Sequence, residues 1–297
     1  MARSETLFFW IAVALYLASS VVYIGAFAFR RPRWLGLALR LALVGFAAHS
    51  GTIVARWVAT GHPPVMRDYE NAVAGAWVIV ALYVALCYRY RWLRGLGLPL
   101  VPLAMLMLGY GLLSNPRLEP LTPAYKSFWL AVHVVFAWFA YSGYVVATGL
   151  AVLYLLRRRQ PGLVGMANGE AGSANVGAGR FAIGDWRLGG RRLPAGELLD
   201  ELSYRLVTFG FLADAVMLVA GSIWASRLWG SYWAWDPVET WSLISWLTYA
   251  VYLHVRVTLR WRGERMAWFA IAALSTVIVS FWGVNYVAGT LHSFRSI

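Results

Sequence analysis

Residues 128–156 read FWLAVHVVFAWFAYSGYVVATGLAVLYLL and contain no Asp, Glu, Lys or Arg. A helix needs about 20 apolar residues to cross the hydrocarbon core of a bilayer, so this run is long enough to span it and to tilt or protrude. The whole chain shares this character, because 60% of its 297 residues are hydrophobic and 13% are charged. A soluble protein of this length could not cover so much apolar surface, so lipid is expected to be the solvent for much of it.

Apolar runs of similar length occur along the rest of the chain and predict its fold class. We expect an all-α integral membrane protein, a bundle of about eight transmembrane helices within one membrane domain, residues 1–297. The predicted spans are residues 7–29, 35–60, 71–88, 96–113, 128–156, 205–228, 239–260 and 266–288. The first run is too long for the core of a signal peptide, so we expect it to be retained as a span.

Arginine residues indicate how these spans are oriented. They gather in every second connection, and the positive-inside rule assigns such connections to the cytoplasm. The clusters are Arg30, Arg31 and Arg33; Arg89, Arg91 and Arg94; Arg157, Arg158 and Arg159; Arg187, Arg191 and Arg192; and Arg260, Arg262 and Arg265. Both termini are therefore expected outside. The net charge of +13 follows from this distribution, so nucleic acid is not an expected partner.

The longest connection, residues 157–204, is predicted to be a cytoplasmic linker. Residues 161–180 are rich in Gly, Ala, Asn and Ser, which is typical of a flexible segment, whereas residues 195–204 either lie on the membrane surface or extend the sixth span. The chain has one cysteine, Cys87, so a disulfide framework, a CxxC redox pair and a cysteine-based metal site are excluded. The chain also lacks CxxCH and is therefore not a c-type cytochrome.

An unusual density of tryptophan marks residues 229–241, which read WGSYWAWDPVETW. The four indoles are Trp229, Trp233, Trp235 and Trp241. Trp229 and Trp233 are four residues apart, so a helical turn would place them on one face. Gly230 and Pro237 interrupt regular helix, which predicts a short interfacial element on the external side. Such a wall suits a large planar aromatic ligand, although an aromatic belt at the lipid headgroups is the competing interpretation.

Two carboxylates in this segment allow two interpretations. Asp236 and Glu239 could act as a catalytic acid–base pair. They also match a helix start, with Asp236 as the N-cap, Pro237 at the first helical position and Glu239 closing a capping box. The structural interpretation is favoured, so their removal is expected to disorder the tryptophan wall.

The depth of each histidine in the bilayer separates its possible roles. His133 lies about five residues into its span and His292 follows the last span, so both are expected at the face of the tryptophan segment. Two imidazoles flanking an aromatic platform could supply both axial ligands of one haem iron. His254 lies in the inner half of its span, where an ionisable side chain is a functional candidate. His49 is expected to form a hydrogen bond within the bundle, although it could be a second ligand, and His62 is expected to shape an external turn.

The stretch WGSYWAWDPVETWSLISWLTYAVYLHVR, residues 229–256, closely resembles the WWD haem-handling motif of the CcsA (ResC) family of cytochrome c-type biogenesis proteins. The resemblance covers most of the chain, because the segments around His133 and His292 also look like that family's flanking histidine segments. Residues 56–70, RWVATGHPPVMRDYE, resemble the family's pattern GHxPxSNxYE. Met66 and Arg67 replace its Ser–Asn pair.

The resemblance implies a haem-handling subunit of a cytochrome c synthase in a bacterial plasma (inner) membrane, with the WWD segment on the external side. His133 and His292 would ligate haem b, and the wall would comprise Trp229, Trp233, Trp235, Asp236 and Trp241. His254 would mark a second haem position whose other ligand comes from the CcsB (ResB) subunit. The implied partners are CcsB, apocytochrome c with its CxxCH motif, and a thiol-reducing pathway. No catalytic residue separate from haem positioning is implied.

Two alternatives remain open at this point. One is a haem carrier similar to the CcmC proteins, which would deliver haem to a separate chaperone. The other is a membrane protein without haem, such as a quinone-binding subunit or a transporter. Haem propionates would need cationic partners. The candidates on the external side are Lys126, Arg56, Arg67, Arg117, Arg227 and Arg295.

Overall fold

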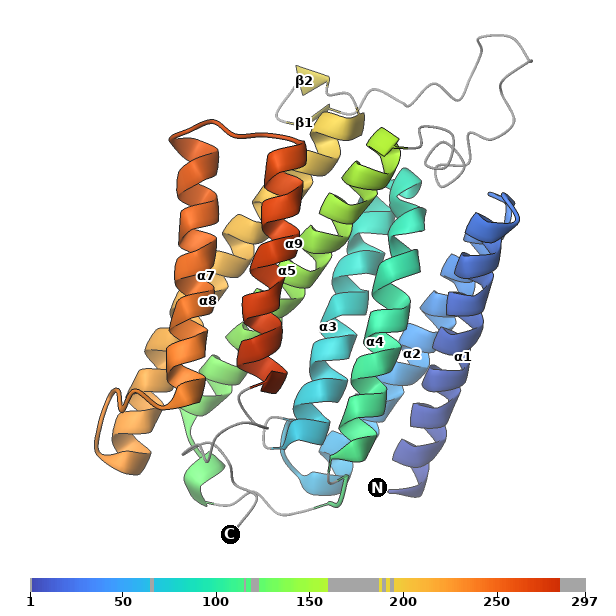
Figure 1. Cartoon of the computed structure of the whole chain (residues 1–297). Coiled ribbons are helices and arrows are strands. Elements are labelled where there is room, and N and C mark those ends of the chain that lie inside the picture. Colours follow the sequence, from blue (N-terminus) through green and yellow to red (C-terminus); the bar gives the residue numbers. More distant parts are fainter. Residues whose placement is uncertain are drawn as a thin grey trace, which may run out of the picture.

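The computed structural model of the chain describes residues 2–64, 67–114, 116–118, 123–159, 187–188, 191–192 and 195–283. Eight long helices lie within these residues (Figure 1). They are α1 (Arg3–Ala28), α2 (Trp34–Thr60), α3 (Asp68–Arg89), α4 (Gly97–Leu113), α5 (Phe128–Arg159), α7 (Ala195–Trp229), α8 (Pro237–Val257) and α9 (Glu264–Ile278). The shorter elements are η1 (Arg91–Leu96), η2 (Pro123–Tyr125), η3 (Val279–Gly283) and an antiparallel pair, β1 (Arg187–Leu188) and β2 (Arg191–Arg192).

The chain is an all-helical membrane protein, as its composition predicts. Seven helical segments of the described chain are long and apolar enough to span a membrane. The long helix outside this set is α8, whose sequence includes Glu239, His254 and Arg256 together with several Ser and Thr. A count of eight spanning helices therefore stays a prediction. Helix α7 begins at Ala195, so residues 195–204 extend the sixth span rather than forming a separate surface helix.

Successive helices run in alternating directions, so the connections gather at two opposite ends of the bundle (Figure 1). We call the end that carries residues 230–236 the tryptophan end, and the end that carries residues 258–263 the arginine end. The connections after α1, after α3 and after α8, each rich in arginine, lie together at the arginine end. This segregation is the arrangement that the positive-inside rule requires of short loops.

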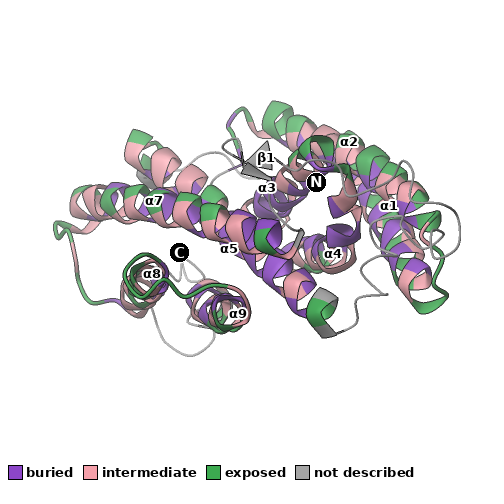
Figure 2. Cartoon of the chain, turned by 90° about the horizontal axis from the view of Figure 1, so that it is seen from above, coloured by how far each residue is buried: buried purple, intermediate pink, exposed green. Residues whose placement is uncertain are grey.

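The helices pack in two groups, each with its own set of buried residues (Figure 2). The first group is centred on α1 to α4, with α1 against α2 and α3 against α4. The second comprises α5, α7, α8 and α9, in which α5 packs along α7. Exposed residues of α1, α2 and the outer side of α7 are largely apolar, which fits contact with lipid rather than water.

A buried ion-pair network fixes the first group at the tryptophan end. Arg56 donates from Nε to Glu70 Oε1 at 3.0 Å and from Nη1 to Glu5 Oε1 at 3.2 Å, and Tyr69 donates to the same Glu5 oxygen at 3.0 Å. The guanidinium also donates to the carbonyls of residues 116 and 117, each at 3.0 Å. Because Arg56 is 2% exposed and its guanidinium is held by two carboxylates and two carbonyls, it is not available to a haem propionate.

His49 lies deeper in the same group. Its Nε2 lies 3.0 Å from the Val73 carbonyl oxygen, and its Nδ1 lies 3.2 Å from the Tyr16 hydroxyl. The side chain is completely buried. The prediction of a hydrogen bond within the bundle is therefore confirmed.

Candidate functional site

His133 projects from the first turns of α5 toward α7, near the tryptophan end. Its Nδ1 lies 2.8 Å from the Met217 carbonyl oxygen. A carbonyl oxygen can only accept, so Nδ1 carries a proton and donates to it. A metal-ligating imidazole commonly has this arrangement, in which a hydrogen bond on one nitrogen fixes the tautomer and orients the other. The orientation of His133 is therefore compatible with a ligand role for Nε2.

The close approach of His133 to α7 depends on Gly221. A Cβ atom built at Gly221 would lie 2.6 Å from His133 Nδ1 and 2.9 Å from its Cε1, distances that real Cβ contacts do not show. Met217 and Gly221 are four residues apart and therefore share one face of α7. The carbonyl that orients the imidazole and the glycine that makes room for it come from the same stripe of the helix.

An aromatic cluster lies beside His133 at the same end. Its buried members are Leu130, Val134 and Trp224, and its half-buried members are Tyr125, Trp129, Trp138, Leu228 and Trp229. Trp224 and Trp229 meet edge to face, with ring centroids 5.3 Å apart. Burial raises the pKa of the Tyr125 hydroxyl above its usual value, although nearby Arg67 opposes the shift, so this phenol stays neutral near pH 7. The cluster joins α5 and α7, the two helices between which His133 lies.

The tryptophan segment departs from the expected geometry at its first residues. Helix α7 ends at Trp229, and Gly230 adopts a φ of +77°, so Trp229 and Trp233 do not share a helical turn. The expectation that their spacing places them on one helical face is wrong, because a left-handed residue redirects the chain between them. Trp233 instead meets Trp235 edge to face, with centroids 5.9 Å apart. Trp235 is 70% exposed.

The start of α8 follows the predicted capping box. Asp236 is the N-cap and its Oδ2 accepts from Val238 N at 3.0 Å, while Pro237 occupies the first helical position. Glu239 Oε2 accepts from Asp236 N at 3.3 Å and from Ala234 N at 2.8 Å. Both carboxylates are therefore bound to backbone donors. Glu239 holds the segment 234–236 against α8, which supports the structural interpretation of these acids.

The other wall residues divide between the turn and the helix. Trp233 is half-buried, and its Nε1 has no hydrogen-bond partner among the described residues. Trp241 is half-buried in the second turn of α8.

His292 lies outside the described residues, so its relation to His133 stays a prediction. Within the described part of the chain, no group of three or more His, Cys, Asp or Glu side chains could hold a metal ion.

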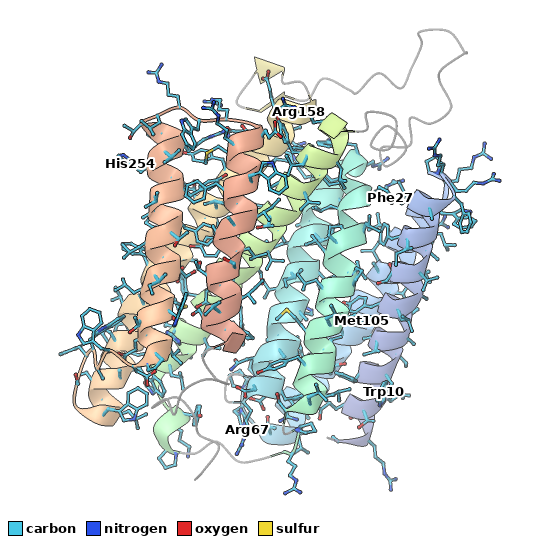
Figure 3. All side chains as sticks on the ribbon, viewed as in Figure 1. Trp10, Phe27, Arg67, Met105, Arg158 and His254 are labelled. Carbon is cyan, nitrogen blue, oxygen red and sulfur yellow. The ribbon has the colours of Figure 1, made fainter. Side chains whose placement is uncertain are left out.

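His254 lies at the opposite end of the molecule. It occupies the last turn of α8, at the same end as Arg158 (Figure 3), and its side chain is exposed. Thr258 Oγ1 lies 3.4 Å from its Nδ1. The turn is fixed by Arg256, which is 4% exposed and donates from Nη1 to Asp200 Oδ2 at 2.6 Å. His133 and His254 are therefore not brought together and could serve only separate positions.

His62 lies in the turn that follows α2. Gly61 ends α2 with a φ of +74°, and the His62 ring lies folded back with Nδ1 2.9 Å from the Pro63 carbonyl oxygen. The side chain is 4% exposed. These contacts support its predicted part in shaping the turn.

Gly221 and Met217 are the site residues that sequence reasoning missed. A glycine inside a long helix costs stability relative to alanine and signals a close approach, so Gly221 carried a detectable signal. Met217 carried none, because it contributes only its backbone carbonyl.

The sequence of the chain is similar to those of known proteins. The family described as Cytochrome C assembly protein matches residues 66–292. The Cytochrome c biogenesis protein CcsA of Gloeobacter violaceus is 32% identical over 95% of this chain and 94% of its own length. The protein of the same description from Parasynechococcus marenigrum is 36% identical over 82% of this chain and 81% of its own length.

A solved structure has a similar fold. The structure described as Cytochrome c Heme Lyase CcmF aligns with a TM-score of 0.67 over 94% of this chain, at 18% identity. The present chain covers 46% of that protein, so it spans less than half of its length. At this identity the likeness establishes a shared fold, and it says nothing by itself about activity.

Proposed function

Since the chain belongs to the CcsA family of cytochrome c biogenesis proteins, we propose that it holds haem b at the tryptophan end of its bundle and presents it to apocytochrome c. In this proposal the tryptophan end faces the outside of a bacterial plasma membrane, and the CcsB subunit completes the synthase. The CxxCH motif of apocytochrome c supplies the two thiols that become attached to haem.

The observation that carries the proposal is the hydrogen bond from His133 Nδ1 to the Met217 carbonyl oxygen, 2.8 Å long. It selects the tautomer whose Nε2 can bind iron, and the aromatic cluster of Trp224 and Trp229 lies on the following turns of α7. An imidazole that is oriented by a backbone carbonyl beside flat apolar side chains fits a planar haem and its iron. His292 would supply the second axial ligand.

The work of the chain in this proposal is positional. Each thiol adds across one haem vinyl group, so a C–S bond forms, the thiol hydrogen passes to the other vinyl carbon, and no electron is lost. Holding the reactants in register can supply a large part of the rate enhancement of such a step. The single thiol of the chain, Cys87, is 5% exposed on the last turn of α3, at the arginine end. The reacting thiols therefore come from apocytochrome c, kept reduced by a separate thiol-reducing pathway.

Two further features have roles in the proposal. Asp236 and Glu239 hold the tryptophan segment by capping α8 and take no part in proton transfer. His254, exposed at the arginine end, would mark a second haem position whose other ligand comes from CcsB. Haem would then pass from the arginine end to the tryptophan end.

The test is a His133→Gly variant, co-expressed with CcsB and a CxxCH reporter in cells supplied with haem. We expect the yield of covalent haem to fall at least about tenfold and the reduced spectrum of the purified protein to lose its bis-imidazole form. Free imidazole should restore the spectrum, which separates loss of a ligand from misfolding. Unchanged yield and spectrum would refute the assignment, whereas bound haem without any covalent product would indicate a haem carrier.

A further inference from the structure

A cavity of about 90 Å³ lies between the two packed groups of helices. Its walls come from α3 and α4 on one side, α9 and Phe281 on the other, and α5 between them. The rim reaches the lipid-facing surface, because Ile278, which lines the cavity, is 45% exposed.

The chemistry of the described cavity walls does not suit haem. None of the lining residues that the structure describes is charged, and none of these is a histidine. Two propionates and an iron would therefore find neither a cationic partner nor an imidazole there. The walls are apolar apart from a few polar side chains, namely Asn71, Tyr141 and Ser142. This composition calls for an uncharged hydrocarbon chain.

Asn71 provides a polar anchor at one end of the cavity. Its Oδ1 is enclosed and has no hydrogen-bond partner among the described residues. A buried acceptor without a donor costs about 1–3 kcal/mol, so this atom calls for an external N–H or O–H group. Asn71 is the fourth residue of α3 and so lies near the tryptophan end, the end at which Figure 3 labels Arg67. That depth corresponds to the level where lipid headgroups meet the hydrocarbon core.

The length of the cavity fits one leaflet. Its α3 wall runs from Asn71 to Ile79, eight residues or about 12 Å of helix rise. Half of a hydrocarbon core of about 30 Å is about 15 Å. An acyl chain that entered at the headgroup level would therefore reach most of the way to the midplane along α5.

From these observations we infer that the cavity binds a phospholipid of the tryptophan-end leaflet, with one acyl chain along α5 and a headgroup that donates a hydrogen bond to Asn71 Oδ1. Phosphatidylethanolamine offers N–H donors and phosphatidylglycerol offers O–H donors. Phosphatidylcholine has the same chains but no headgroup donor, so it serves as the matched control ligand.

The experiment measures lipid retained by the purified full-length protein. Protein in nanodiscs that contain equal amounts of the three lipids is moved into mild detergent, and bound lipid is identified by native mass spectrometry. We expect about one lipid per protein, with phosphatidylethanolamine or phosphatidylglycerol retained about fivefold over phosphatidylcholine, as one net hydrogen bond allows. Comparison of the two donor lipids tells whether N–H or O–H is preferred.

Three variants assign the lipid to the cavity. Asn71→Leu should abolish the headgroup preference while keeping the chain bound. Ile278→Trp fills the rim from a half-exposed position and should lower total retention about tenfold. Val54→Trp is the control, because Val54 is 59% exposed on α2 and does not line the cavity.

Equal retention of all three lipids by the parent protein, or unchanged retention in Ile278→Trp, would overturn the inference. Elution volume and melting temperature show whether each variant is folded. Haem content is measured in the same samples, so failure of the haem assignment would leave the lipid result standing.

Discussion

At the scale of single residues, the position of His133 in the proposed site depends on the glycine that it packs against, Gly221. Gly221→Ala adds a Cβ atom 2.6 Å from His133 Nδ1, so the ring must move away from the Met217 carbonyl. We expect haem affinity to fall between about tenfold and a hundredfold, the usual cost of losing the hydrogen bond that orients a metal ligand. Haem titration of the purified protein, followed in the reduced spectrum, measures the change.

Gly109→Ala is the matched control for that substitution. Gly109 also lies inside a long helix, and a Cβ atom there would meet nothing within 4 Å. Both changes raise helix propensity by similar amounts, so they differ only in the clash with His133. Equal haem affinity in the two variants would show that the contact between α5 and α7 does not orient the ligand.

The partners of the histidines show where sequence reasoning stops at this scale. His133 could be selected from its depth in the span, because helix rise converts residue number into distance. Its hydrogen bond could not be predicted, because the acceptor is a backbone carbonyl 84 residues away. The same holds for His49 and the Val73 carbonyl, 24 residues apart. The local sequence pattern identifies a candidate histidine, but its hydrogen-bond partner is determined by how the helices pack.

At the scale of elements, the start of α8 tests whether the acids position or catalyse. Asp236→Ser keeps a good N-cap but removes the carboxylate, whereas Asp236→Ala removes both. If the acid only caps α8, we expect the Ser variant to retain most of the covalent haem yield. The Ala variant should lose about 1 kcal/mol of helix stability and most of the yield. The reporter assay, with melting temperature as a second readout, measures both.

The opposite outcome of this pair is equally informative. If Asp236→Ser loses as much yield as Asp236→Ala while its melting temperature stays near that of the parent protein, the carboxylate itself is required. The positional interpretation of the tryptophan segment would then be wrong, and proton transfer at Asp236 would have to enter the mechanism.

The same segment separates what local sequence can and cannot predict about an element. The capping box was predictable because N-cap, Pro and Glu lie within four residues and act on adjacent backbone groups. The face shared by Trp229 and Trp233 was predicted wrongly. Gly230 takes a left-handed conformation and ends α7, so a four-residue spacing no longer means one helical turn. The sequence shows a glycine at position 230, but it does not predict the direction that the chain takes after it.

At the scale of the whole molecule, hydropathy predicted the helical architecture well, because lipid requires backbone groups to be satisfied within each span. The contacts between spans were beyond its reach. Arg56 was a candidate partner for a haem propionate, yet it joins Glu5 of α1 to Glu70 of α3. In the sequence, Glu5 lies 51 positions from Arg56 and Glu70 lies 14 positions from it. The sequence shows which side chains are charged. Which of them form ion pairs depends on how α1, α2 and α3 pack together.

The orientation of the bundle is the remaining property at this scale, and single cysteines can determine it. Ser231 lies exposed at the tryptophan end and Arg262 lies exposed at the arginine end. If the arginine end is cytoplasmic, a membrane-impermeant thiol reagent should label Ser231→Cys in intact cells and Arg262→Cys only after permeabilisation. Native Cys87 is 5% exposed, so the parent protein gives the background signal. Labelling of Arg262→Cys alone in intact cells would place the tryptophan end in the cytoplasm. Haem could then not be presented to apocytochrome c outside the membrane, however well His133 binds it.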